Sequence, residues 1–484
     1  MVVLRTGTRR GPIQAVAEWP LFSSPECFSN AMNSSISHGN GQVAGWVSGP
    51  NSRGTIDIIW SSLITIFLCT WTAICLNIPH TDDTQFKILY RKAKWMFWAI
   101  VGPELVLAVA IGQFASARRS VKRFHNLGIH NWTLRHGFFA DMGGILLQTK
   151  DFAPFLVNSR QLAYLVEKKY LECPKITEDE IWDKSKADTM SKILTLLQAS
   201  WLMISLLGRA ILKLPTSTLE LSAGAIVLCT IGTSFCWLRK PCDVKKGILI
   251  ATEATAAQIL IDAGAEAANP YRNTPLDFVA KESMTFGCDV MGFFGMRSDN
   301  PERPLRQFPN DRFPDISTLE KFSLFWITSA FGGFHLIGWN FVFPTRLELL
   351  LWRVSSSMVT GVTVFFWLIE TIAARHRFGR WDKYLIRLRL KTPLPEQALT
   401  SDDSASDLEG GVNRRHTIRR MDEFEKLQKK AKPILKWEVG LIIPIVILYA
   451  VARGYMVFEA FASMRELPVG VFQTVSIIDS IPHW

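Results

Sequence analysis

The stretch that decides the fold is residues 55–76, TIDIIWSSLITIFLCTWTAICL. It is a nearly continuous apolar run of the length that a helix needs to cross about 30 Å of hydrocarbon. Similar runs recur along the chain, which predicts an all-α fold: a polytopic transmembrane helical bundle. Overall composition is less decisive, because 48% of the residues are hydrophobic and soluble domains approach that fraction too.

Six further runs have spanning length and are separated by polar or proline-containing segments. They cover about residues 95–117, 190–212, 218–238, 322–343, 349–372 and 437–461. An additional segment, 132–148, is apolar but short and contains Arg135, His136 and Asp141. This segment can cross the membrane, enter and leave it on the same side, or lie at its surface. The sequence therefore predicts seven or eight spans.

Polar segments divide the chain into regions. The predicted regions are a disordered leader (1–53), an N-terminal transmembrane region (54–238), an insertion (239–320), a transmembrane pair (321–372), a basic loop (373–432) and a last span with its tail (433–484). The basic loop carries 15 Lys and Arg between Arg375 and Lys432, and it contains a Ser/Asp/Gly-rich patch typical of disorder.

Charge sets the expected orientation, because Lys and Arg are enriched in cytosolic loops. The basic loop, and by alternation the insertion, are predicted to be cytosolic, with the C-terminus outside. The N-terminus is outside if 132–148 crosses and cytosolic if it does not, and the flanking charges favour the outside only slightly. Two sequons, at Asn33 and Asn131, can carry glycans in the first case. Thr417 follows Arg414-Arg415-His416 and is a candidate phosphorylation site.

The net charge of +11 comes mostly from Lys and Arg beside apolar runs, the pattern of contacts with lipid headgroups. No groove-reading or stacking motif accompanies it, so the lipid bilayer and not nucleic acid is the expected partner. The eight cysteines form no C-x-x-C pair and no Cys/His set with zinc spacing. We expect no disulfide framework, no metal site and no cofactor.

Charged residues inside apolar runs are expensive, at about 2.5–3.5 kcal/mol each at mid-helix, so each needs a partner or a function. Glu104 follows Pro103 inside the second run, and Arg453 lies mid-span in the last, four residues after Tyr449. An ion pair between Glu104 and Arg453, with His335 nearby, is the predicted polar centre. Such a pair is either a site for a hydrophobic small molecule or a purely structural contact.

Two further pairs of polar residues have spacings that suggest a contact. Arg209 and Glu220 flank a short turn and are expected to pair. His136 and Asp141 match the H-x4-D spacing of some lipid acyltransferases, in which the Asp orients a His general base, but two fixed positions recur often by chance. No phosphate-binding loop, nucleophile elbow or zinc-protease motif is present.

Several segments carry a resemblance. They are RGTIDIIW (53–60), WTLRHGFFADMGG (132–144), HLIGWNFVFPT (335–345), SMRELP (463–468) and IPH (481–483). In these segments the chain resembles a large fungal family of multispan integral membrane proteins, over most of 53–484. The resemblance implies a membrane bundle but no single activity.

Three functions stay open. Some multispan fungal proteins of this size in secondary-metabolite pathways are terpene cyclases, which protonate an epoxide or an olefin inside the membrane. By analogy the chain is a biosynthetic or accessory component of such a pathway, with Glu104 as proton donor. A small-molecule carrier or exporter is an alternative, although no internal repeat is evident. A receptor-like or scaffolding protein acting through the basic loop is the third.

Overall fold

The computed structural model describes residues 37–38, 42–49, 53–268, 270–271, 273–279, 303–310, 318–377 and 436–474. Asn33, Thr417 and the Ser/Asp/Gly-rich patch lie outside these residues, so the predictions that rest on them stay predictions.

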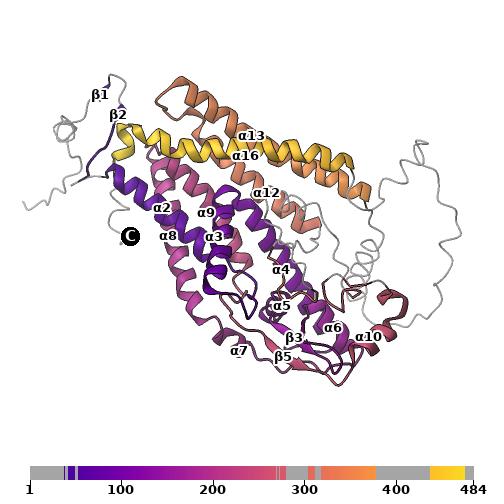
Figure 1. The fold of residues 1–484 in the computed structure, drawn as a ribbon. Helices are drawn as coiled ribbons and strands as arrows, with labels where there is room; N and C mark the ends of the chain where they lie inside the picture. Colours follow the sequence, from indigo (N-terminus) through magenta and orange to yellow (C-terminus); the bar gives the residue numbers. More distant parts are fainter. Residues whose placement is uncertain are drawn as a thin grey trace, which may run out of the picture.

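Long helices make up most of the described chain (Figure 1). They are α2 (Thr55–Thr72), α3 (Gln85–Val101), α4 (Pro103–Asn126), α8 (Lys186–Ile211), α9 (Thr218–Cys236), α12 (Thr318–His335), α13 (Arg346–Arg377) and α16 (Lys436–Ala462). Shorter helices are α5 (Leu134–Asp141), α6 (Ser159–Glu167), α7 (Glu178–Asp183) and α10 (Ala256–Ala263), with 3-10 turns η1 (Gly264–Ala267), η2 (Leu336–Asn340), η4 (Ser463–Arg465) and η5 (Val469–Phe472). The predicted helical class is confirmed.

Five helices in the described part of the chain, α2, α8, α9, α13 and α16, are long and apolar enough to cross a membrane. Their outward faces carry large apolar side chains; on α2 these are Ile56, Trp60, Leu63 and Phe67, spaced to form one stripe. A stripe of this kind facing away from the protein is what lipid contact requires.

Two small sheets accompany the helices. The first is antiparallel and joins β1 (Ser37–His38), β2 (Gln42–Ala44) and β6 (Glu466–Pro468) in that order. The second has the order β4 (Phe155–Leu156), β3 (Ile145–Gln148), β5 (Ile248–Ala251), with β3 and β5 parallel. Each sheet therefore links segments that lie far apart in the sequence.

One end of the bundle gathers the two termini of the described chain, and we call it the terminal end. There β2 pairs with β6, where α2 begins and α16 ends (Figure 1). Arg209, at the end of α8, donates hydrogen bonds to the carbonyls of Pro215, Gly470 and Gln473. The short connections between α8 and α9 and between α12 and α13 lie at this end as well.

The opposite end carries the second sheet, and we call it the sheet end. Asn77, just after α2, contacts Asn310, which precedes α12. Cys75 and Cys242 form a disulfide that ties the end of α2 to the segment after α9. The expectation that no cysteines are paired is wrong at this position, because two residues 167 apart in the sequence give no spacing signal.

The predicted span 95–117 is not one helix. α3 ends at Val101, α4 begins at Pro103, and their axes differ by 113°. Proline lacks the N–H that an α-helix interior needs and disfavours helical geometry in the residue before it. Gly102 accordingly has φ −143° and ψ 70°, and Pro103 takes the first helical position, where a missing N–H costs nothing.

The ambiguous segment 132–148 does not form a membrane-length helix. It contains the eight-residue helix α5 and the strand β3, which pack in the core of the sheet end with Phe139, Met142 and Ile145 fully buried. Gly137 in α5 lies against α4, where a Cβ would come within 3.0 Å of the Ala117 carbonyl oxygen. This segment is therefore a packed part of the sheet end.

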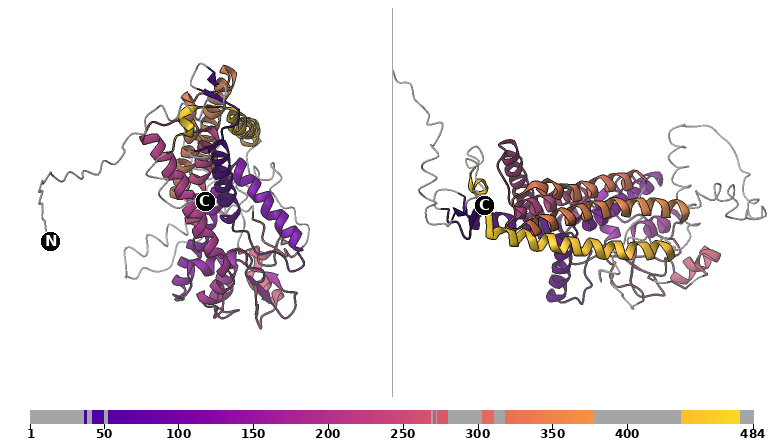
Figure 2. Two further views of the ribbon diagram at one scale, coloured as in Figure 1. Left: turned by 90° about the vertical axis from the view of Figure 1, so that its left-hand side faces the viewer. Right: turned by 90° about the horizontal axis from the view of Figure 1, so that it is seen from above.

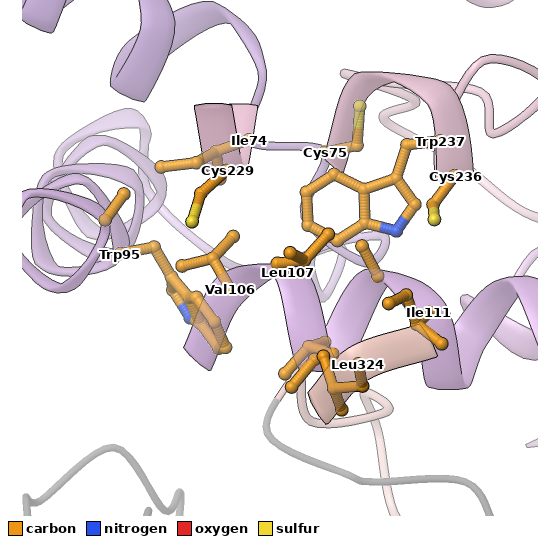
Figure 3. Close-up of a cluster of buried hydrophobic side chains, with 14 of the residues drawn as sticks. Ile74, Cys75, Trp95, Val106, Leu107, Ile111, Cys229, Cys236, Trp237 and Leu324 are labelled. Carbon is orange, nitrogen blue, oxygen red and sulfur yellow. The ribbon is translucent and has the colours of Figure 1, made fainter. Parts of the chain in front are cut away.

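Helix α4 lies at the centre of the molecule. Val106, Leu107 and Ile111 of α4 are in one apolar cluster with Trp95 of α3 and Leu324 of α12 (Figure 3). The cysteines and the tryptophan at the end of α9 complete the same cluster. A charged residue at the start of α4 is thus held in apolar surroundings, and its polar partners must come from neighbouring helices.

Candidate functional site

The break between α3 and α4 leaves the last carbonyls of α3 without helical partners. Arg453 of α16 supplies two of those partners. Its Nε donates to the carbonyl of Val101 at 3.0 Å, and its Nη2 donates to the carbonyl of Ile100 at 3.2 Å. Only 1% of Arg453 is exposed, so the guanidinium acts as a buried cap for the end of α3.

The third nitrogen of Arg453 contacts His335, the last residue of α12. Nη1 lies 2.8 Å from His335 Nε2, and His335 Nδ1 lies 3.0 Å from the carbonyl of Phe331. Since Arg453 can only donate, Nε2 accepts and the imidazole proton resides on Nδ1, where it reaches the carbonyl. The guanidinium also stacks over the Phe331 ring at 5.0 Å.

Glu104 stands on the other side of the break, in the first turn of α4, where the helix dipole favours a carboxylate. The Tyr449 hydroxyl donates to its Oε1. Its Oε2 is buried and has no hydrogen-bond partner. Buried polar oxygens are almost always satisfied in proteins, so an unsatisfied one needs an explanation, of which a catalytic role and a bound water are two.

Three predicted site residues, Glu104, His335 and Arg453, are therefore gathered in one cluster from α4, α12 and α16. The predicted ion pair is wrong in detail, because Tyr449 and not Arg453 binds the Glu104 carboxylate. Tyr449, the partner of Glu104, was not predicted to be part of this centre. Its spacing of one helical turn from Arg453 was the available signal.

The predicted Arg209–Glu220 pair does not form, and neither does a contact between His136 and Asp141. Glu220 pairs with Arg53, whereas Arg209 binds backbone carbonyls. His136 contacts Thr133 and the carbonyl of Ile176, and it does not contact Asp141. The H-x4-D arrangement is therefore no catalytic dyad here, since the base and its orienting carboxylate must be hydrogen-bonded.

A second buried polar group, at Lys240, was not expected. Its Nζ donates to the carbonyl of Cys75 at 2.6 Å, to Gln113 Oε1 at 2.8 Å and to Asn77 Oδ1 at 3.3 Å. Burial, with a smaller effect of the Lys192 charge, lowers the pKa of Lys240 to about 7. In the sequence Lys240 follows a long apolar run like any flanking basic residue, so no local pattern distinguishes it.

Within the residues that the structure describes, no group of three or more His, Cys, Asp or Glu side chains is arranged to hold a metal ion. Hydrogen bonds hold the cluster at the α3–α4 break together. It offers one unsatisfied carboxyl oxygen, a phenol and a fixed guanidinium, all surrounded by aromatic and aliphatic side chains.

Fold and site together define a class: a mostly helical protein with several helices of membrane-spanning length and a buried polar centre at a broken helix. Residues 27–263, just under half of the chain, match a family described as "Family of unknown function (DUF8562)". The match includes Glu104 and Lys240 but ends before His335 and Arg453. Comparisons with curated proteins and with solved structures find no match.

Proposed function

We propose that the chain is a polytopic integral membrane protein that acts on a hydrophobic small molecule, with Glu104 as the reacting acid. The observation that carries this proposal is the Glu104 carboxyl group, buried at a helix break with one oxygen bound by Tyr449 and the other without a partner. A group placed in this way has a free position from which a proton can be delivered.

The proposed arrangement in the membrane has six crossings. Five are the apolar helices α2, α8, α9, α13 and α16, and the sixth is α12, which is less apolar than these five and packs against α9 and α13. α3 and α4 together form a re-entrant pair. Support comes from the connections on either side of the pair: Asn77, before α3, and α5, after α4, both belong to the sheet end. Both termini of the described chain then lie on the same side, and every long connection lies on the other.

Charge favours the sheet end as the cytosolic side. The loop between α13 and α16 connects two helix ends at the sheet end and carries 15 Lys and Arg between Arg375 and Lys432. The short connections at the terminal end carry few basic residues. With this orientation Asn33 is on the outer side and Asn131 is cytosolic, so only Asn33 would be glycosylated.

The proposed chemistry is an acid-initiated cyclisation. The Glu104 carboxylic acid protonates an epoxide oxygen as its C–O bond breaks, or an alkene carbon, and the resulting cation is attacked by a neighbouring alkene of the same molecule. Loss of a proton from the last cation to the Glu104 carboxylate gives a new alkene and regenerates the acid. The substrate and product are isomers, so no cofactor is consumed.

The surroundings of Glu104 fit such a reaction. Arg453 is held by backbone carbonyls and by His335, so it fixes the end of α3 without neutralising Glu104 directly. Trp352, which is fully buried with its ring centre 6.5 Å from that of His335, provides an aromatic face that stabilises a cation. The proposed place in a fungal secondary-metabolite pathway comes from analogy with membrane terpene cyclases of similar size, span number and buried carboxyl groups.

A carrier is the second candidate, and the broken helix favours it. Carriers often bind substrate where discontinuous helices expose polar groups near the middle of the membrane. In that case Glu104 and Arg453 would bind the passenger and release it on the other side. The scaffold hypothesis depends on the basic loop, most of which lies outside the described residues.

The test is to delete the gene in its host and to compare small molecules inside and outside the cells by mass spectrometry. Complementation with Glu104→Gln is compared with Glu459→Gln, a matched control that alters another buried carboxyl group hydrogen-bonded to a tyrosine, Tyr455. For an enzyme, we expect the deletion to accumulate a linear precursor and Glu104→Gln to lower product by at least about 100-fold.

Each alternative gives a different result. Product that is made but retained inside deleted cells would replace the enzyme with a carrier. An unchanged set of metabolites on both sides of the membrane would reject both. A Glu104→Gln variant that is present at normal levels and restores full product would reject Glu104 as the acid.

A further inference from the structure

The two oxygens of the Glu104 carboxyl group have different surroundings. The Tyr449 hydroxyl donates to Oε1, whereas Oε2 is buried and has no partner in the described part of the chain. Gly102 also lies beside Oε1, because a Cβ at this glycine would be 3.5 Å from that oxygen. Oε1 is thus covered by Tyr449 and by the helix break, and Oε2 is the oxygen that is left for a reacting molecule.

The Tyr449 ring is held in place by two helices. α16 runs along the length of the bundle beside α13 (Figure 2). The ring packs against the apolar cluster that contains Trp352 of α13 and Met456 of α16. One turn further along α16, Arg453 is hydrogen-bonded to the end of α3 and to His335. The hydroxyl of Tyr449 therefore has a fixed position relative to the α3–α4 break.

The neighbouring cation does not replace Tyr449 as a partner of the carboxyl group. The guanidinium of Arg453 donates to two carbonyls at the end of α3 and contacts His335. Among the described residues, Tyr449 is the one side chain that donates a hydrogen bond to Glu104. The difference between the two carboxyl oxygens is therefore due to Tyr449.

From this geometry we infer that Tyr449 is a positioning residue, which sets the acid proton of Glu104 on Oε2 and stabilises the carboxylate that remains after the proton is delivered. Because the phenol donates to Oε1, the carboxylic acid has its carbonyl oxygen at Oε1 and its proton on Oε2. A hydrogen bond to an ionised oxygen is roughly twice as strong as one to a neutral oxygen, so Tyr449 favours the carboxylate over the acid. This inference rests on the proposed function of Glu104.

Tyr449 keeps its own proton throughout the proposed reaction. The O–H bond at Oε2 breaks as a bond forms between the proton and the substrate oxygen or carbon, and the electron pair of the O–H bond stays on the carboxylate. The phenol remains hydrogen-bonded to Oε1. When the last cation loses a proton, Oε2 takes it up, and the acid is restored with its proton in the original place.

A purely structural role is the alternative, because a buried tyrosine hydroxyl usually has a hydrogen-bond partner in any protein. Tyr455 provides the comparison that separates the two roles. Its hydroxyl lies 3.1 Å from Glu459 Oε2, and the other oxygen of Glu459 is likewise buried without a partner in the described chain. Tyr455→Phe is therefore the matched control for Tyr449→Phe.

The first experiment locates the proton by infrared spectroscopy of the full chain in a detergent without carbonyl groups. The carbonyl stretch of protonated Glu104 is the band that is lost in Glu104→Gln. With the proton on Oε2, this carbonyl group accepts from Tyr449, so Tyr449→Phe should move the band to higher wavenumber, and Tyr455→Phe should leave it in place.

Two spectroscopic results would contradict these assignments. With the proton on Oε1, the carbonyl group would already be free, and an unmoved band in Tyr449→Phe would overturn the inference. If Glu104→Gln removes no such band, Glu104 is ionised, and the proposed acid itself is rejected.

The second experiment measures product in deleted cells that are complemented to equal protein levels. Tyr449→Phe keeps the ring and removes only the donor. We expect it to lower product by about 10- to 100-fold, the effect of one hydrogen bond to a charged group, while Tyr455→Phe restores full product. Equal product from the two variants would overturn the inference alone. Full product from Glu104→Gln would instead reject the reacting acid, so the two failures are distinguishable.

Discussion

Individual residues at the α3–α4 break show how far a sequence can predict a site. Glu104, His335 and Arg453 stand out because ionisable groups inside apolar runs need partners. The contacts that these residues make depend on how distant helices pack, and no local sequence pattern predicts that packing. Arg453 binds three groups, two carbonyls and one imidazole, and these compete successfully with the Glu104 carboxylate.

Lys240 provides a test of burial at a single residue. Its pKa of about 7 in the folded protein lies below the ordinary value near 10.4, so between these values the unfolded chain binds a proton that the folded chain does not. The free energy of unfolding should therefore rise with pH from about 7 to about 10, by up to about 1.4 kcal/mol per pH unit. Below pH 7 the effect of Lys240 is constant.

We expect Lys240→Met to remove this part of the pH dependence. The measurement is the thermal unfolding midpoint in detergent at several pH values from 6 to 10, for the native protein, Lys240→Met and Lys245→Met. Lys245 is exposed and should leave the slope unchanged. Identical slopes in all three proteins would contradict a low pKa for Lys240.

At the scale of elements, close helix packing depends on particular glycines. α12 and α13 approach each other at Gly332, where a Cβ would lie 3.0 Å from Thr360 Cα and 3.2 Å from Thr360 Oγ1. The neighbouring Gly333 has no atom within 4 Å of its Cβ position. Small residues allow helix backbones to approach in membrane proteins, so Gly332 and Gly333 should differ sharply in tolerance.

We expect Gly332→Ala to lower the free energy of unfolding by about 1–3 kcal/mol, because the added methyl group forces the helices apart. Gly333→Ala should be neutral or stabilising by up to about 1 kcal/mol, since alanine favours the helix more than glycine does. Thermal unfolding of the two variants in the same detergent checks the difference. Equal destabilisation would mean that α12 and α13 are not in close contact at this position.

For the whole molecule, the main structural result is that the two ends of the bundle are different. The termini of the described chain meet at one end through β2 and β6. The long connections, the second sheet and the disulfide between Cys75 and Cys242 lie at the other. To determine the orientation of the protein in the membrane, it is enough to know which of the two ends faces the cytosol.

Glycosylation answers this question. With the sheet end in the cytosol, Asn33→Gln should abolish any glycosidase-sensitive change in electrophoretic mobility, and Asn131→Gln should leave it intact. Asn131 is exposed, so access to the transferase would not be limited by packing.

The reverse result would place the sheet end outside. It would also explain the disulfide, because disulfides persist in oxidising compartments and are rare in the cytosol. A Cys75–Cys242 disulfide that is found intact in protein from growing cells would therefore favour the sheet end outside.

The sequence by itself determined the class of fold. Apolar runs of spanning length predict helices because an unpaired backbone cannot be placed in hydrocarbon, and that argument needs no knowledge of neighbours. The sequence also identified Glu104, His335 and Arg453 as candidate site residues, because an ionisable residue inside an apolar run can be recognised from that run alone. Pro103 implies that a helix ends before it, although the predicted span 95–117 runs through this position.

Tertiary structure alone decided everything that depends on pairs of distant residues. Tyr449 binds Glu104 across 345 positions, Cys75 meets Cys242, and Lys240 binds Cys75, Asn77 and Gln113. The return of α4 to the sheet end also required the fold, because hydropathy measures the length of a run and not its direction. Contacts of this kind depend on how helices pack, and packing is a property of the whole chain.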